Sequence, residues 1–132
     1  MKKSIEDYYG SDIGRMPNAI AYAARYAPDA FDGYMQSRIA VISDNPTHQL
    51  PKKYANLIFA ILDVATGNIE GATNHSRAAL NAGLHQDELV TAYVQAWLVA
   101  GFAAAWGKVC WRVLEQLEKE GLVTPPPDPT ED

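Results

Sequence analysis

Hydrophobic positions along the chain recur at helical spacing, and no segment alternates cleanly over more than a few residues, so the sequence predicts an all-α fold. Proline suits a first helical turn and glycine suits the position after a last turn, and these residues divide the apolar stretches. The expected helices cover residues 17–26, 28–42, 52–65, 70–82 and 84–120. Gly101 and Gly107 are candidate breaks in the last of them, and residues 43–51 (SDNPTHQLP) form an expected loop.

The apolar run from Leu89 to Trp106 is about as long as a membrane-spanning helix. Polar Thr91 and Gln95 interrupt it, and its many alanines make it only weakly hydrophobic. A helix that is apolar on all sides can instead be buried in protein. In a chain of this size such burial indicates subunit contacts, so we expect a homo-oligomer and no membrane partner.

The 132 residues suit one domain, expected over residues 1–122 and followed by a disordered tail at 123–132 that is rich in proline and acidic residues. The net charge of -5 and the lack of a Lys/Arg cluster argue against a nucleic-acid partner and favour a small-molecule partner. Cys110 is the single cysteine, and the N-terminus lacks the apolar segment of a signal peptide, so we expect a cytoplasmic protein.

One histidine has unusual neighbours in the expected helix 70–82. Four polar residues of this helix share a stripe that is typical of a solvent-exposed face: Glu70, Asn74, Arg77 and Asn81. His75 lies on the opposite side, where its neighbours at helical spacing are all small: Gly71, Ala72, Ala78, Ala79 and Ala82. Small residues around one bulky polar side chain either let a second backbone pack closely or leave a concavity for a ligand.

Two interpretations of His75 follow from its position. The ring is either a core histidine bonded to a backbone carbonyl of an adjacent helix, or a proton donor or acceptor that lines a small pocket. In the second case burial among alanines disfavours the imidazolium and leaves a neutral ring that acts as a base or polarises a carbonyl near pH 7. Spacing alone leaves both interpretations open.

Helix 52–65 is apolar on most sides except for a strip that holds Lys52, Asn56 and Asp63. The general rule that charged residues remain solvated favours a narrow solvent-exposed edge. The alternative places Asn56 and Asp63 at the same pocket as His75. The other histidines have no cysteine or acidic partner at metal-binding spacing, so we expect no metal site.

Three segments carry a resemblance to a known family: IGRMPNAIAYAARYAPDAFDGYMQ, LPKKYANLIFAILDVATGN and NHSRAALNAGLHQDELVTAYVQAWLVAGFAAA. In order and spacing they resemble the carboxymuconolactone decarboxylase family, which belongs to the alkylhydroperoxidase D-like (AhpD-like) group. The resemblance implies an all-α domain of about six helices that assembles as a trimer or hexamer. It also implies active sites between helices, often near subunit contacts, with His75 at the position of the active-site histidine.

The peroxidase branch of that group is disfavoured by the residues around His75. The resemblance implies cysteines at the seventh and fourth positions before the histidine and a proton-relay glutamate at the nineteenth. This chain has Asn68, Gly71 and Asn56 there, so thiol peroxidase chemistry lacks its thiolate and its resolving partner.

The resemblance therefore points to the cysteine-free decarboxylase branch. It implies a cofactor-free step in which a small carboxylated lactone or aromatic-derived acid loses carbon dioxide and His75 protonates the resulting enolate. An anionic substrate needs cations, and the candidates are Arg38, Lys52 and Lys53. The expected substrate-binding residues are Asn56, Asp63, Lys52, Arg38 and Gly71. Residues 45–49 lack the arginine and tryptophan expected in true carboxymuconolactone decarboxylases, which leaves the substrate open.

Two other functions remain open at this point. The same fold and pocket would also suit a non-catalytic small-acid-binding protein or an accessory subunit, because Asn56, Asn68 and Gly71 replace the reactive residues of the wider group. A purely structural helical oligomer would have no cavity beside His75.

Overall fold

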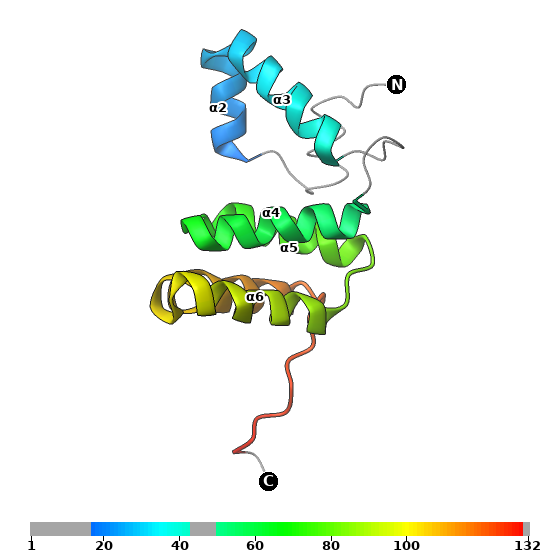
Figure 1. The fold of residues 1–132 in the computed structure, drawn as a ribbon, viewed down its shortest axis with the longest axis vertical. Helices are drawn as coiled ribbons and strands as arrows, with labels where there is room; N and C mark the ends of the chain where they lie inside the picture. Colours follow the sequence, from blue (N-terminus) through cyan, green and yellow to red (C-terminus); the bar gives the residue numbers. More distant parts are fainter. Residues whose placement is uncertain (1–16, 43–49, 131–132) are drawn as a thin grey trace.

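The structure is a computed structural model that describes residues 17–42 and 50–130. These residues form six α-helices and one π-helix and contain no strand, which confirms the all-α prediction (Figure 1). In chain order the elements are α2 (Asn18–Tyr26), α3 (Pro28–Ile42), α4 (Lys52–Thr66), α5 (Ile69–Asn81), α6 (Gln86–Ala100), the π-helix η2 (Ala103–Cys110) and α7 (Trp111–Lys119). Most of the expected loop, with His48 and positions 45–49, lies outside the described residues, as does the N-terminal segment 1–16.

Helices α4 and α5 form a tight hairpin in the middle of the molecule (Figure 1). Gly67 ends α4 with a φ of 80°, a left-handed conformation that glycine adopts without steric penalty. Asn68 then caps α5, because its side-chain oxygen accepts a hydrogen bond from the Gly71 N–H at 2.9 Å. The hairpin thus fixes the face of α5 that carries His75 relative to α4.

The expectation of one long helix over 84–120 is wrong, because the chain turns back on itself at Gly101. This residue has a φ of 99° and ends α6, and η2 and α7 then return beside α6 and the hairpin (Figure 1). Gly107 lies inside η2 and does not break it. No helix of the described ranges has the length and apolar character needed to cross a membrane. Leu98 and Val99 at the end of α6 are exposed in the single chain.

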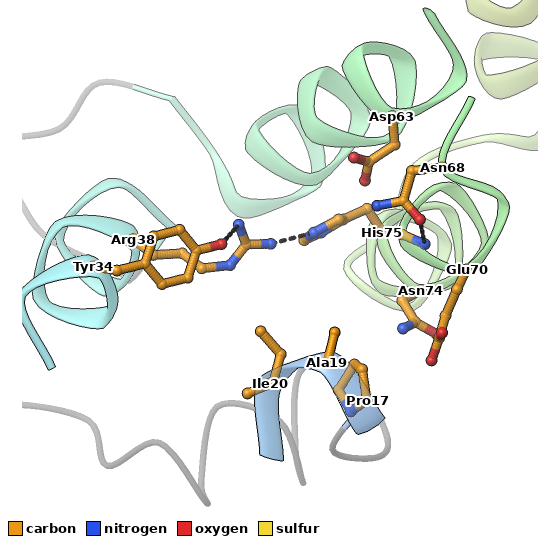
Figure 2. A pocket seen from close by; sticks show the side chains of 11 residues that line it. Pro17, Ala19, Ile20, Tyr34, Arg38, Asp63, Asn68, Glu70, Asn74 and His75 are labelled. Atoms are coloured by element: carbon orange, nitrogen blue, oxygen red, sulfur yellow. Dashed lines mark hydrogen bonds between the residues drawn. The ribbon is translucent and has the colours of Figure 1, made fainter. Parts of the chain in front are cut away.

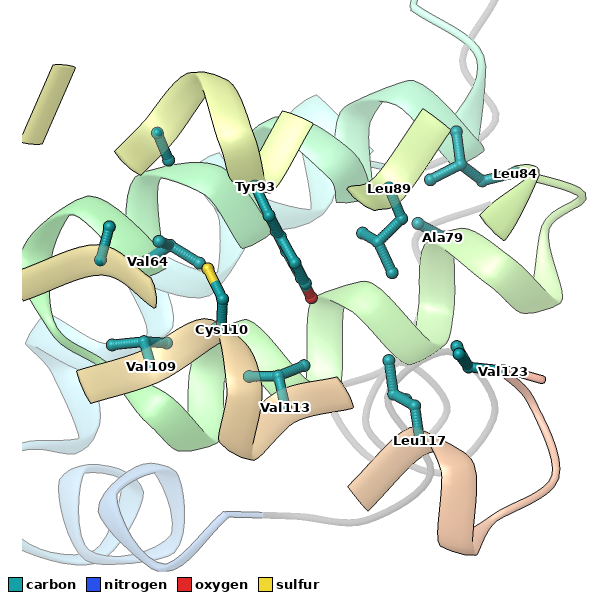
Figure 3. Close-up of a cluster of buried hydrophobic side chains, with 13 residues drawn as sticks. Val64, Ala79, Leu84, Leu89, Tyr93, Val109, Cys110, Val113, Leu117 and Val123 are labelled. Atoms are coloured by element: carbon teal, nitrogen blue, oxygen red, sulfur yellow. The ribbon is translucent and has the colours of Figure 1, made fainter. Parts of the chain in front are cut away.

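The main core lies between α4, α5, α6, η2 and α7, with the Tyr93 side chain in its middle (Figure 3). Tyr93 and Ser76 are both fully buried, and their hydroxyl groups form a hydrogen bond that links α6 to α5. A second cluster, made by Phe31, Met35, Ala55 and Ala78, attaches α3 to the hairpin. This second contact holds α3 close to the His75 face.

The Tyr93–Ser76 bond gives a prediction on stability. Tyr93→Phe removes one partner and leaves the buried Ser76 hydroxyl without its hydrogen bond, so we expect a loss of about 1–3 kcal/mol in the free energy of unfolding. Urea denaturation measures it, with Tyr22→Phe at an exposed position as the control. The Tyr93→Phe/Ser76→Ala double variant should be no less stable than Tyr93→Phe, and a wild-type stability of Tyr93→Phe would contradict the prediction.

The chain remains packed beyond the last helix. Val123 is buried in the main core, and Thr124 exchanges two hydrogen bonds with the Gln86 side chain at 2.8 and 2.9 Å. The non-helical tail was expected to be disordered from residue 123, but these contacts place Val123 and Thr124 with the folded domain. The expected disorder of the later tail residues stays a prediction.

Candidate active site

His75 projects from α5 and is 4% exposed. Its Nδ1 lies 3.0 Å from the side-chain oxygen of Asn56 on α4, and its Nε2 contacts the guanidinium of Arg38 on α3. Both ring nitrogens therefore bond to polar side chains from other helices. The core-histidine interpretation, which expected a backbone carbonyl as the partner, does not describe this ring.

Asn56 determines which nitrogen of the ring carries the proton. Its Nδ2 donates to the Lys52 carbonyl oxygen at 3.0 Å, which turns its Oδ1 toward His75. An amide oxygen only accepts, so His75 Nδ1 donates and the lone pair of the neutral ring lies on Nε2. Asn56 is fully buried, and the expectation of a solvent-exposed edge at this position is wrong.

Arg38 reaches the imidazole across an aromatic surface. Its Cζ lies 4.7 Å from the centroid of the Phe59 ring, and the same ring stacks on His75 with centroids 5.0 Å apart. The Nη1 of Arg38 also donates a hydrogen bond to the hydroxyl of Tyr34, one helical turn earlier on α3, at 3.1 Å. Phe59 and Tyr34 thus hold a cation directly beside Nε2.

Burial, followed by the nearby positive charge of Arg38, lowers the pKa of His75 from 6.5 to about 3. The ring is therefore neutral at pH 7, as the sequence predicted for a histidine enclosed by alanines. A neutral ring with its lone pair on Nε2 accepts protons and hydrogen bonds.

A cavity of about 190 Å³ opens beside His75 between α2, α3, α4 and α5 (Figure 2). The described residues that line it are Pro17, Ala19, Ile20, Tyr34, Arg38, Asp63, Asn68, Glu70, Gly71, Asn74 and His75. The volume is below the roughly 300–1,000 Å³ typical of sites for drug-sized ligands, so the cavity suits a small molecule. The hypothesis of a purely structural oligomer predicts no such space beside His75, and the cavity contradicts that prediction.

Asp63 and Gly71 both line this cavity. Burial raises the pKa of the Asp63 carboxyl, while the charge of Arg38 and a hydrogen bond from Asn68 act in the opposite direction. A Cβ added to Gly71 would lie 2.5 Å from Asp63 Oδ2 and 2.6 Å from Asn68 Nδ2. Glycine at position 71 therefore leaves the space that the carboxylate and the amide occupy.

The expected substrate-binding residues occupy three kinds of position. Arg38, Asp63 and Gly71 line the cavity with His75, and Asn56 lies behind the imidazole as its hydrogen-bond partner. Lys52 is not among the described residues that line the cavity, although its carbonyl oxygen orients Asn56.

Tyr34 and Asn74 also line the cavity but were not predicted as site residues. The spacing of four residues between Tyr34 and Arg38 on one helix was an available signal for their pairing. Asn74 was placed on a solvent-exposed stripe, yet it is 4% exposed and accepts a hydrogen bond from Arg77 at 3.0 Å. Arg77 in turn forms an ion pair with Glu120, which no local pattern around Asn74 indicates.

Cys110 lies in the main core, away from this site. Burial raises the pKa of its thiol to about 12, so the thiol is protonated at neutral pH. Among the residues that the structure describes, no three His, Cys, Asp or Glu side chains are grouped as metal ligands.

No family model and no curated protein matches the chain. Among solved structures, it is similar to a protein of Burkholderia xenovorans LB400 whose crystal structure is provisionally named a carboxymuconolactone decarboxylase. The two share 37% sequence identity over 89% of this chain and 92% of the other, with a TM-score of 0.77. Identity at this level over nearly the whole of both chains confirms the predicted resemblance. The chain belongs to the carboxymuconolactone decarboxylase family.

Proposed function

We propose that this protein is a carboxy-lyase that removes carbon dioxide from a small carboxylated lactone or aromatic-derived acid, or that it catalyses a related proton transfer on such a molecule. His75 is the proton-transfer residue, and the reaction uses no cofactor. The observation that carries the proposal is the position of His75 Nε2. It lies at the cavity beside the Arg38 guanidinium, while Asn56 holds the opposite nitrogen. Such a ring is oriented, neutral and next to a cation.

An acid that enters the cavity brings a negative charge to Arg38, and a guanidinium pairs well with such a charge through parallel N–H···O bonds. The pairing draws Arg38 away from His75 Nε2 and offsets its positive charge, which after burial is the second cause of the lowered imidazole pKa. The substrate therefore promotes protonation of the ring at Nε2.

In the proposed step the bond between the substrate carbon and its carboxylate breaks, and carbon dioxide leaves uncharged. The electron pair moves into the conjugated carbonyl, where the oxygen takes up the negative charge close to Arg38. The proton on His75 Nε2 then moves to the enolate carbon, and the imidazole takes a new proton from water. The charge and the proton are thus handled by two neighbouring side chains.

Incubation with carboxymuconolactone and related unsaturated lactone acids in deuterium oxide tests the proposal. We expect release of carbon dioxide and one deuterium on the product carbon. Proton transfer is reversible, so the protein should also exchange the corresponding C–H of the decarboxylated lactones. Acids that bind with the carboxylate against His75 and show neither reaction would contradict the proposal and favour the small-acid-binding alternative.

A further inference from the structure

Asn74 on α5 is the neighbour of His75 in the chain and lines the same cavity (Figure 2). The side-chain amide has an oxygen that accepts hydrogen bonds and a nitrogen that donates two of them. The oxygen accepts from Arg77 Nη1 at 3.0 Å. No described residue accepts a hydrogen bond from the nitrogen Nδ2. An almost fully buried residue of the cavity thus has a donor that the described part of the chain does not use.

The orientation of this amide is determined by Arg77. A guanidinium only donates hydrogen bonds, so it pairs with the amide oxygen and the nitrogen must point elsewhere. Arg77 is itself held by Glu120 at the end of α7, through Nε–Oε1 at 2.6 Å and Nη2–Oε2 at 2.8 Å. Two parallel bonds to one carboxylate fix the plane of the guanidinium as well as its position. A half-turn of the Asn74 amide would place its nitrogen against Arg77 and lose the bond.

The nitrogen of Asn74 reaches open space. Among the described residues, every fully buried side-chain nitrogen or oxygen has a hydrogen-bond partner. Nδ2 has none there, so the small exposed part of Asn74 includes this atom. The cavity that Asn74 lines holds a small molecule, and an oxygen of that molecule would accept the unused hydrogen bond.

A carbonyl oxygen is the acceptor that fits this donor. In the proposed reaction the carboxylate of the acid pairs with Arg38 on α3, and the conjugated carbonyl is the other acceptor of the ligand. Asn74 approaches from α5 and is uncharged, as is the carbonyl before the bond to carbon dioxide breaks. A preorganised donor at an oxygen that gains negative charge stabilises the transition state more than the substrate.

We propose that Asn74 Nδ2 donates a hydrogen bond to the carbonyl oxygen of the bound acid, and that Arg77 and Glu120 are positioning residues that keep this nitrogen toward the cavity. Asn74 is then a catalytic residue beside His75, because it contacts the oxygen that becomes the enolate oxygen. The inference rests on the proposed function, since it assigns a ligand contact within the same cavity.

Calorimetric titration with two matched acids tests the contact: 5-oxotetrahydrofuran-2-carboxylate, a lactone acid, and tetrahydrofuran-2-carboxylate, which lacks only the ring carbonyl. Wild type should bind the lactone acid about fivefold more tightly, the gain that one hydrogen bond of typical net strength provides. The readout is the ratio of the two affinities, because a change in charge or stability alters both together. Equal binding of the two acids by wild type, or binding of neither, would overturn the inference.

Two substitutions at position 74 remove the donor in different ways. Asn74→Ala removes the whole amide, whereas Asn74→Asp keeps the shape and still accepts a hydrogen bond from Arg77. Both should abolish the preference for the lactone acid. Asn81→Ala, at an exposed residue at the end of the same helix, is the matched control and should keep the wild-type ratio. A preference that persists in both Asn74 variants would overturn the inference.

The positioning role is tested from outside the cavity. Arg77→Met leaves the Asn74 amide free to turn its oxygen toward the ligand, so the preference for the lactone acid should fall. In the Arg77→Met/Asn74→Ala double variant the ratio should equal that of Asn74→Ala alone, because Arg77 acts only through the amide. A wild-type ratio in Arg77→Met would overturn the positioning role.

Turnover distinguishes this inference from the proposed function. With an acid that wild type decarboxylates, Asn74→Asp should lower the turnover number about 10²-fold, as loss of one such donor does, with a smaller change in KM. A folded Asn74→Asp protein that turns over at the wild-type rate would overturn only the inference. If wild type binds the lactone acid through Asn74 but neither releases carbon dioxide nor exchanges a C–H, the contact is supported and the proposed function is overturned.

Discussion

Replacement of His75 by glutamine is expected to lower the turnover number for the acid substrate by about 10²–10⁴-fold, the range that general acid–base groups contribute. Glutamine keeps a polar group between Asn56 and the cavity and fits a similar volume. It has no nitrogen that gains and releases a proton near neutral pH. The enolate would then take its proton from water alone.

Binding of the acid should change much less than turnover, because Arg38 and the walls of the cavity remain. A KM within a few-fold of the wild-type value, together with the loss in turnover number, would assign His75 to the chemical step. A rise in KM with an unchanged turnover number would instead assign His75 to binding.

The matched control is His85→Gln at the start of α6. His85 is exposed and does not line the cavity, and its backbone N–H keeps the hydrogen bond to Glu88 after the substitution. This variant should turn over the substrate at the wild-type rate. If His75→Gln, folded as judged by circular dichroism, also retains that rate, then His75 is not the proton-transfer residue.

Local patterns predicted a helix end well where the backbone conformation of a single residue determines it. Pro28 begins α3 and Gly67 ends α4, and both effects depend only on the φ angles that these residues allow. The direction of the chain after Gly101 could not be predicted in the same way. A glycine at a helix end signals a stop, but the return of η2 along α6 depends on packing with distant residues.

The candidate site shows the same limit. The small residues around His75 predicted an enclosed imidazole, and this part of the site needed only helical spacing. Its partners lie 19 and 37 positions away on α4 and α3, so neither Asn56 nor Arg38 could be assigned to a ring nitrogen from the sequence. Asn74 was misplaced because Arg77 and Glu120, 43 positions apart, form the ion pair beside it.

Acidification from pH 7 to pH 4 is expected to lower the free energy of unfolding by roughly 2–4 kcal/mol through His75 alone. In the unfolded chain this histidine has its ordinary pKa of 6.5, whereas burial and then Arg38 lower its pKa to about 3 in the folded protein. Between these two values the unfolded state binds more protons. The stability that is fully present above pH 6.5 is therefore lost as the pH falls toward 3.

Urea denaturation of wild type and His75→Gln at several pH values between 4 and 7.5 measures this effect. Glu120 contributes in the same direction, because the hydrogen bond from Arg77 lowers its pKa, and Asp63 in the opposite direction, because burial raises its pKa. Both remain in the variant, so the difference between the two curves isolates His75. We expect the wild-type free energy of unfolding to fall more steeply below pH 6.5. Only in wild type does unfolding release the neutral His75 ring into water, where it takes up a proton. Parallel curves would show that the His75 pKa is the same in the folded and unfolded states, and a ring with that property could not be both enclosed and paired with Arg38.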